Sequence, residues 1–151
     1  MPEQAIPVTY GDPPGGPGTL WSARSRFPFH ETLQGLKEAI AAEDLLLIHE
    51  IDPQVIMARG GFVTWPIRQL LFFHPRFMVR LLEGDPSALV EVPLKVVILE
   101  MPDGRVFVRR PDTQNAFRRY LNLRQLGAEL DGICQRLVGT VAIPEPWHND
   151  C

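Results

Sequence analysis

The amino-acid sequence predicts an α+β domain in which an antiparallel sheet has helices packed on one face. Short apolar runs that end at proline or aspartate alternate with longer segments whose apolar residues recur at helical spacing. Two of the short runs are joined by a tight turn, which is typical of a hairpin. The chain has 151 residues, 45% of them hydrophobic and 22% charged, which is the composition of a single globular domain.

The N-terminal segment differs in composition from the rest of the chain. In residues 11–18, seven of the eight residues are Gly or Pro, which cannot continue a helix or a strand. Residues 1–20 are therefore expected to form a flexible or loosely docked arm. We expect ordered structure to begin near Trp21, one domain over residues 21–140, and a C-terminal tail over residues 141–151.

The predicted elements follow in the order strand, helix, two strands, helix, hairpin, helix. Residues 31–43 form the first helix, because their apolar residues recur at helical spacing: Leu33, Leu36, Ala39 and Ile40. The run Leu45–Ile51 is short and strongly apolar, which favours a buried strand that ends at Asp52-Pro53. Residues 53–61 hold a short helix that ends at Gly60-Gly61.

The second half of the domain begins with an apolar strand, Pro66–His74. The residue before a proline avoids the helical conformation, so the strand ends at His74 and Pro75 opens a helix over residues 76–83. Leu94–Met101 is the clearest strand, and the turn Pro102-Asp103-Gly104 leads it back into Arg105–Arg110.

A helix over residues 114–138 closes the domain, with one narrow apolar stripe: Leu123, Leu126, Leu130, Ile133 and Leu137. Together with the helices over 31–43 and 76–83, it is expected to lie over one face of the sheet. The other face would then expose apolar side chains from several strands, a patch that a symmetric homodimer would bury.

Composition and end sequences restrict the classes of protein that fit. The formal net charge is −3, and the chain lacks the interleaved aromatic and basic residues of RNA-binding sheets, so we expect no nucleic-acid partner. The sequence has no run of about eighteen apolar residues and no secretory signal, so we expect no membrane association. Two cysteines cannot form a disulfide framework, which favours the cytoplasm.

Two phrases of the sequence resemble a small bacterial family, the domain of unknown function 302. The first is FPFHETLQGLKEAIAAEDLLLIHEID; the second is LLFFHPRFMVRLLEGDP, followed by VPLKVVILEMPDGRVFVRRPDT and a closing helix. The resemblance covers residues 22–139. It implies a fold like that of the TATA-binding protein and homodimers formed through the sheet, and it implies no activity.

The chain departs from the family pattern at two positions. Many members have Cys-Asn-Pro where this chain has Phe73-His74-Pro75, and Leu-Pro-Cys where it has Val92-Pro93-Leu94. Both thiols are absent, so thiol or soft-metal chemistry at these positions is not expected. A histidine, His74, occupies one of the vacated places.

His74 is the foremost candidate for a site residue. It ends a rigid strand just before a helix, with aromatic neighbours that include Phe73 and Phe77, and a neutral imidazole can ligate a transition metal or the iron of a non-covalent haem. His49 lies on the preceding strand and is a second candidate metal ligand. The alternatives are that His74 caps the following helix, that His49 lies at a sheet edge or dimer contact, and that the phenylalanines are ordinary core.

Other candidate donors are placed less favourably. His30 lies in the first turn of a helix, which explains it without ligand chemistry. His148 and Cys151 offer nitrogen and sulfur donors in a tail that nothing pre-organises. Cys134 lies on the apolar side of the last helix and is expected in the core.

Arginine dominates the basic residues, with thirteen Arg and two Lys. Six arginines lie between residues 105 and 124, and such a cluster can grip a phosphate or the carboxylates of a ligand. Of these we select Arg109 as the residue that holds an anionic group. The alternative is that the arginines form a solvated face.

Two classes of function fit these observations. The first is a non-enzymatic small-ligand, metal or haem binder whose cofactor-binding residues are His74, His49, Phe73, Phe77 and Arg109. The second is a protein–protein interaction module without a cofactor. An enzyme ranks third, because no nucleophile–base pair, phosphate loop or paired carboxylates can be assembled from the motifs.

Overall fold

A computed structural model describes residues 4–12 and 21–144. Its central element is a five-stranded antiparallel sheet with the strand order β2-β7-β6-β5-β3. The strands of this sheet are β2 (Trp21–Arg24), β3 (Leu46–Ile51), β5 (Ile67–Phe73), β6 (Leu94–Glu100) and β7 (Val106–Arg110). A separate two-stranded parallel sheet joins β1 (Ile6–Pro7) to β4 (Phe62–Val63).

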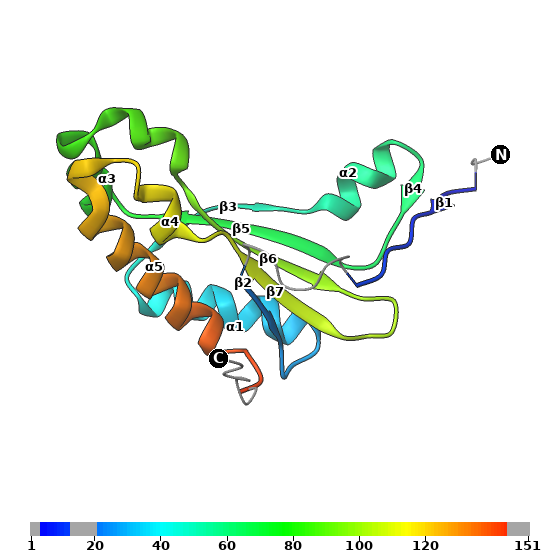
Figure 1. Ribbon diagram of the computed structural model, residues 1–151. Coiled ribbons are helices and arrows are strands. Elements are labelled where there is room, and N and C mark those ends of the chain that lie inside the picture. The colour runs from blue at the N-terminus through cyan, green and yellow to red at the C-terminus, as the bar shows by residue number, and fades with distance from the viewer. Residues whose placement is uncertain (1–3, 13–20, 145–151) are drawn as a thin grey trace.

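Two long helices, α1 (Phe29–Ala42) and α5 (Arg124–Gly139), lie side by side beneath one face of the five-stranded sheet (Figure 1). The expected α+β architecture, an antiparallel sheet with helices on one face, is confirmed. The remaining helical segments are α2 (Pro53–Arg59), α3 (Pro75–Gly84), η1 (Pro86–Glu91), α4 (Thr113–Phe117) and η2 (Leu121–Leu123).

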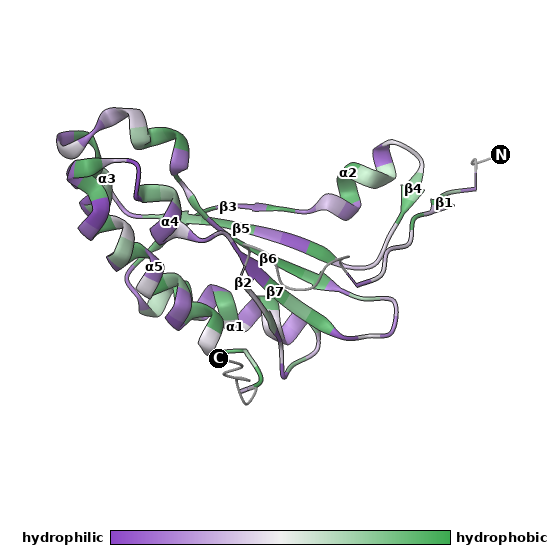
Figure 2. Cartoon of the chain, in the orientation of Figure 1, coloured by the Kyte–Doolittle hydropathy of each residue, from purple (hydrophilic) through white to green (hydrophobic). Residues whose placement is uncertain are grey.

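The core lies between the sheet and these two helices. Along β6 and β7, residues that point toward the helices are buried and their neighbours are half-buried, as strand alternation requires. Fully buried side chains of the sheet include Leu70, Phe72, Val96, Ile98 and Val108, and the same cluster includes Leu36 and Leu130 from the helices. Figure 2 shows apolar segments along both the strands and the helices beneath them.

Most local predictions are confirmed, but the run Leu45–Ile51, expected as a buried strand, forms the edge strand β3, whose first four residues are exposed because it has a sheet neighbour on one side, β5. The hairpin of β6 and β7 forms around Pro102-Asp103-Gly104, where Gly104 has φ +91°, a left-handed conformation that glycine adopts without strain. Helix α2 begins at Pro53 and ends at Gly60, and its N-cap Asp52 accepts a hydrogen bond from the Gln54 N–H. Among the described residues no helix is both long and apolar enough to cross a membrane.

The prediction of one continuous helix over residues 114–138 is wrong. The segment is divided into α4, η2 and α5, and α4 folds back against α5. A Cβ added to Gly127 would lie 2.4 Å from the Cβ of Phe117, so the two helices approach closely at this glycine. A continuous helix would hold these residues more than two turns apart, and the burial of Phe117 stabilises the break.

The position of α3 also differs from the expectation that it lies over the sheet. It packs against η1, η2 and α5 at the end of β5 (Figure 1). The reason is local: β5 continues directly into α3 through His74-Pro75, so the helix begins where the strand ends and extends past that end of the sheet.

The described part of the arm is docked, whereas we expected ordered structure to begin near Trp21. The Ile6 N–H donates to the Gly61 carbonyl and the Val8 N–H donates to the Val63 carbonyl, each at 2.8 Å. These bonds hold residues 4–12 beside β4, and the arm then reaches the end of β6 at Glu100.

Candidate functional site

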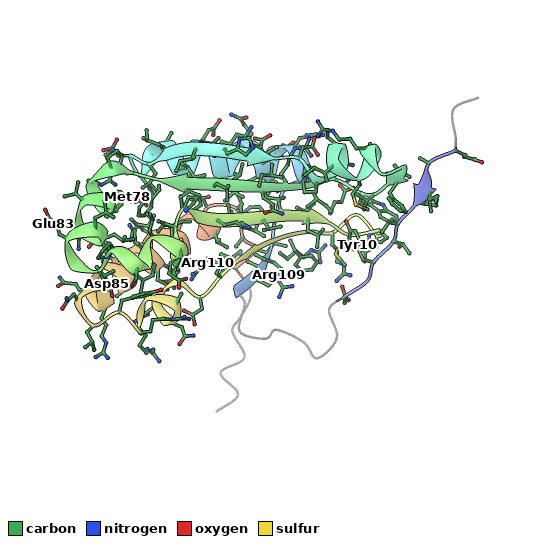
Figure 3. All side chains as sticks on the ribbon, turned by 90° about the horizontal axis from the view of Figure 1, so that it is seen from above. Tyr10, Met78, Glu83, Asp85, Arg109 and Arg110 are labelled. Atoms are coloured by element: carbon green, nitrogen blue, oxygen red, sulfur yellow. The ribbon has the colours of Figure 1, made fainter. Side chains whose placement is uncertain are left out.

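The sheet face opposite α1 and α5, here called the open face, is turned toward the viewer in Figure 3. Residues directly opposite each other in an antiparallel sheet point to the same side. The strand registers therefore place three rows of side chains across the open face. The rows are Arg24, Phe107, Leu99 and Ile67; Ser22, Arg109, Val97, Gln69 and Ile51; and Lys95, Leu71 and His49.

Arg109 lies in the middle row, and its environment is unusual for an arginine. Its side chain is half-buried, and its Nε atom is buried with no hydrogen-bond partner. None of the ion pairs found within residues 4–12 and 21–144 includes it. An N–H group removed from water without an acceptor is unfavourable, so the Nε of this arginine is suited to an anion supplied from outside these residues.

A pocket of about 200 Å³ lies beside Arg109, between the open face and the arm. Its walls are mainly apolar, and they come from the arm and from strands β2, β6 and β7 together with the turn that follows β6. The lining residues are Tyr10, Gly11, Asp12, Ser22, Leu99, Met101, Phe107 and Arg109.

The acidic side chains around this pocket are bound to another arginine, Arg105. Its Nη2 lies 2.8 Å from the Asp12 carboxylate and its Nε lies 2.7 Å from the Asp103 carboxylate. The backbone N–H and side chain of Arg105 donate to Asp103 and hold the pKa of that carboxyl below its usual value. Both carboxylates are therefore already paired with Arg105, and neither forms an ion pair with Arg109.

Tyr10 forms the wall contributed by the arm. Its hydroxyl donates to the carbonyl oxygen of Glu100, and its ring meets Trp65 edge-on with centroids 5.8 Å apart. Burial raises the pKa of Tyr10 above its ordinary value. The phenol is therefore protonated at neutral pH and acts as a fixed polar anchor for the arm.

His74 has a structural role that accounts for its position. It is the N-cap of α3, and its Nδ1 accepts a hydrogen bond of 3.0 Å from the Arg76 N–H. Phe73 and Phe77 are only 2% and 3% exposed and pack with ring centroids 6.1 Å apart. Both rings lie in the core, so they provide no open wall for a haem beside His74.

The structure does not bring His49 and His74 together. His49 is exposed on the edge strand β3 and pairs with Leu71, three residues before His74, which is roughly 10 Å along a strand. Within the described ranges no three His, Cys, Asp or Glu side chains gather as metal ligands do. The donor set around these histidines therefore does not fit a metal centre or a haem site.

The other candidates are dispersed. Arg109 and Arg110 point to opposite faces of β7, and Arg110 is buried and pairs with Asp131, so the six arginines do not form one patch. Cys134 is in the core as expected, and burial raises the pKa of its thiol to about 11. His30 is exposed in the first turn of α1. His148 and Cys151 lie outside the described residues.

Sequence reasoning selected Arg109 but missed Tyr10 and Asp12. Tyr10 lies next to the Gly/Pro-rich stretch and Asp12 lies within it, and the composition of this stretch favours a flexible or loosely docked arm. The one available signal was Tyr10 itself, because an aromatic residue in a polar arm gains stability when it packs against a domain.

The fold and the site together define a small α+β domain with one helix-covered sheet face and one open face, which carries an arginine that forms no ion pair within residues 4–12 and 21–144. The chain belongs to the family "Domain of unknown function DUF302", whose model matches residues 21–141. Among curated proteins there is no match to this chain.

A solved structure has the same fold. It is the crystal structure of an uncharacterized conserved DUF302 protein from Bacillus stearothermophilus, with a TM-score of 0.75 and 14% sequence identity. The similarity covers 83% of this chain and 99% of the other chain. At this identity the likeness concerns the fold.

Proposed function

We propose that the protein is a non-enzymatic binding domain that holds a small organic anion at Arg109 on the open face. The observation that carries this proposal is the half-buried guanidinium, whose Nε has no acceptor among the described residues. An incoming carboxylate or phosphate would accept charge-assisted hydrogen bonds from it, and these are about twice as strong as neutral ones.

The groups around the pocket support binding rather than catalysis. A general base must be free to take a proton, whereas Asp12 is bound to Arg105 and the Tyr10 hydroxyl donates to a backbone carbonyl. Ser22 contributes a hydroxyl, but the lining residues include no histidine, and their carboxylate, Asp12, is bound to Arg105. The lining residues therefore lack a nucleophile–base pair.

The same proposal includes a homodimer formed through the other half of the open face. Around β3 and β5 this half carries Ile51, Ile67 and Leu71, and the adjoining edge strand exposes Leu46 and Ile48 by 53% and 56%. Single exposed apolar residues are common on monomer surfaces, whereas a group of neighbouring ones is typical of an interface. Light scattering at micromolar concentration should give twice the mass of one chain, and a monomer would contradict this part of the proposal.

The ligand part of the proposal is tested by binding of simple anions to the full chain. Acetate, benzoate, phosphate and sulfate are titrated by calorimetry and by thermal unfolding, with wild type, Arg109→Met and Arg59→Met. Arg59 is an exposed arginine on α2 and serves as the matched control. At least one anion should bind wild type and Arg59→Met and lose at least tenfold in affinity with Arg109→Met; four anions without such dependence would refute the proposal.

The alternative from the sequence, a protein–protein interaction module, is favoured by the exposed apolar residues of the β3 edge. Absorbance and metal analysis of purified protein separate it from the histidine hypothesis. A colour or a stoichiometric metal that His74→Ala removes and His148→Ala retains would favour a metal or haem at His74. Colourless, metal-free protein that binds no anion through Arg109 and co-purifies with a defined partner would favour the interaction module.

A further inference from the structure

We infer that the Arg109 pocket selects a flat apolar carboxylate with a single negative charge, of about the size of benzoate, and that Tyr10 sets the upper limit of its size. This inference rests on the proposed function and specifies its ligand class. It follows from the volume, walls and charge of the pocket, and from the way the arm is held.

The volume limits the ligand to a small molecule. The pocket has about 200 Å³, whereas pockets for drug-sized ligands have roughly 300–1,000 Å³. A single ring with one substituent fits this scale, and a fused-ring system or a porphyrin exceeds it.

The walls favour an apolar and planar body. Leu99 and Met101 supply aliphatic surface, and Phe107 and Tyr10 supply aromatic rings from the sheet and from the arm. Aromatic side chains interact well with other rings in offset or edge-on arrangements. A flat ring therefore gains contacts on these walls that a hydrated inorganic anion does not.

The charge around the pocket favours a monoanion. The charged side chains of the lining are Asp12 and Arg109, and Asp12 is paired with Arg105, so Arg109 is the lining charge without an ion pair among the described residues. Ser22 lies directly opposite Arg109 in the strand register, so its hydroxyl is placed to share the same carboxylate. A phosphate dianion would leave an uncompensated negative charge beside apolar walls.

The arm holds Tyr10 against the pocket from three directions. Its hydroxyl is bonded to the Glu100 carbonyl, its ring contacts Trp65, and two residues later Asp12 pairs with Arg105. The backbone before it is bonded to β4 through Val8. A wall that is held in this way limits the length of the ligand. Removal of the Tyr10 ring should enlarge the pocket on the side where the arm closes it.

The experiment compares three probes on the full chain by calorimetry: benzoate, the neutral benzamide, and the two-ring 2-naphthoate. Wild type should bind benzoate at least tenfold more tightly than benzamide and than 2-naphthoate. Tyr10→Ala should remove the size preference by raising the affinity for 2-naphthoate at least tenfold. Tyr10→Phe retains the ring and should keep the preference of wild type, which controls for loss of the hydroxyl alone.

The outcomes separate this inference from the proposed function. If acetate, phosphate or sulfate binds through Arg109 while benzoate does not, the ligand class is wrong and the proposed function stands. Equal affinity for benzoate and benzamide, or an unchanged size preference in Tyr10→Ala with native circular dichroism, also overturns the inference. If no anion binds in an Arg109-dependent way, the proposed function itself fails.

Discussion

Two adjacent arginines on β7, Arg109 and Arg110, have different burial and different partners because they lie on opposite faces of the sheet. Arg110 points toward the helices, is 5% exposed, and lies 2.8 Å from the Asp131 carboxylate of α5. Arg109 points to the open face, where its Nε is buried without an acceptor among the described residues. The two residues have opposite surroundings because successive strand residues face opposite sides.

The different environments of Arg110 and Arg109 separate a charge that stabilises the fold from one that we propose for binding. On the covered face Asp131 also accepts from the Gln114 N–H, so the ion pair ties β7, α4 and α5 together. On the open face the neighbouring carboxylates are paired with Arg105, and Arg109 has no ion pair among the described residues, which is the basis of the proposed anion site. The contrast between the two faces leads to four measurable differences in stability.

The largest effect is expected from Phe72→Ala compared with Leu71→Ala, two neighbours on β5. Phe72 is fully buried on the covered face, so its truncation should cost about 4 kcal/mol of unfolding free energy. Leu71 is half-buried on the open face and should cost less than half of that. Urea unfolding measures both, and equal costs would show that the open face is packed as tightly as the covered one.

The second prediction breaks the buried ion pair with Arg110→Met. This change leaves the Asp131 carboxylate, which is 14% exposed, without its guanidinium, and should cost about 3 kcal/mol. The double variant with Asp131→Leu should lose less than the sum of the single variants, because it removes both charges. Additive losses in urea unfolding would contradict a direct coupling between the two residues.

The third prediction concerns Cys134, which lies on the covered side near Arg110 and Asp131. Burial raises the pKa of its thiol from 9.0 to about 11, so in the folded protein it keeps its proton when the unfolded chain releases it. Folding stability should therefore fall as pH rises from about 9 toward 11, by about 1 kcal/mol at pH 10 from this group.

The measurement is urea unfolding at pH 7 and pH 10 for the Cys151→Ser chain with and without Cys134→Ala. The loss between the two pH values should be smaller without the Cys134 thiol. An identical loss in both chains would show that the thiol does not contribute to it.

The smallest effect on stability is expected from Arg109→Met, the counterpart of Arg110→Met on the open face. Because the guanidinium has no ion pair among the described residues, its removal should change the free energy of unfolding by at most about 0.5 kcal/mol. Urea unfolding checks this value beside the Arg59→Met control. A loss above about 2 kcal/mol would show that Arg109 belongs to the fold rather than to a binding site.

Most strands and helices of the domain and their order could be predicted from the sequence, because the signals for them are local. Proline after His74 ends β5 and starts α3, and Asp103-Gly104 turns β6 back into β7. Alternation along β6 and β7 already separates Arg109 from Arg110. The resemblance to the family was likewise readable from local phrases of the chain, and the family match over residues 21–141 confirms it.

The contacts of each of these residues, in contrast, depend on the tertiary structure. The helical spacing of apolar residues over 114–138 does not predict that α4 folds back so that Phe117 packs on Gly127, because this contact joins residues ten positions apart. The alternation of residues along a strand does not predict the distance between His49 and His74. It also does not predict that the arm packs on the domain with Tyr10 beside Arg109. Such contacts join distant segments through packing and hydrogen bonds, and no periodicity within one segment encodes the partner it will find.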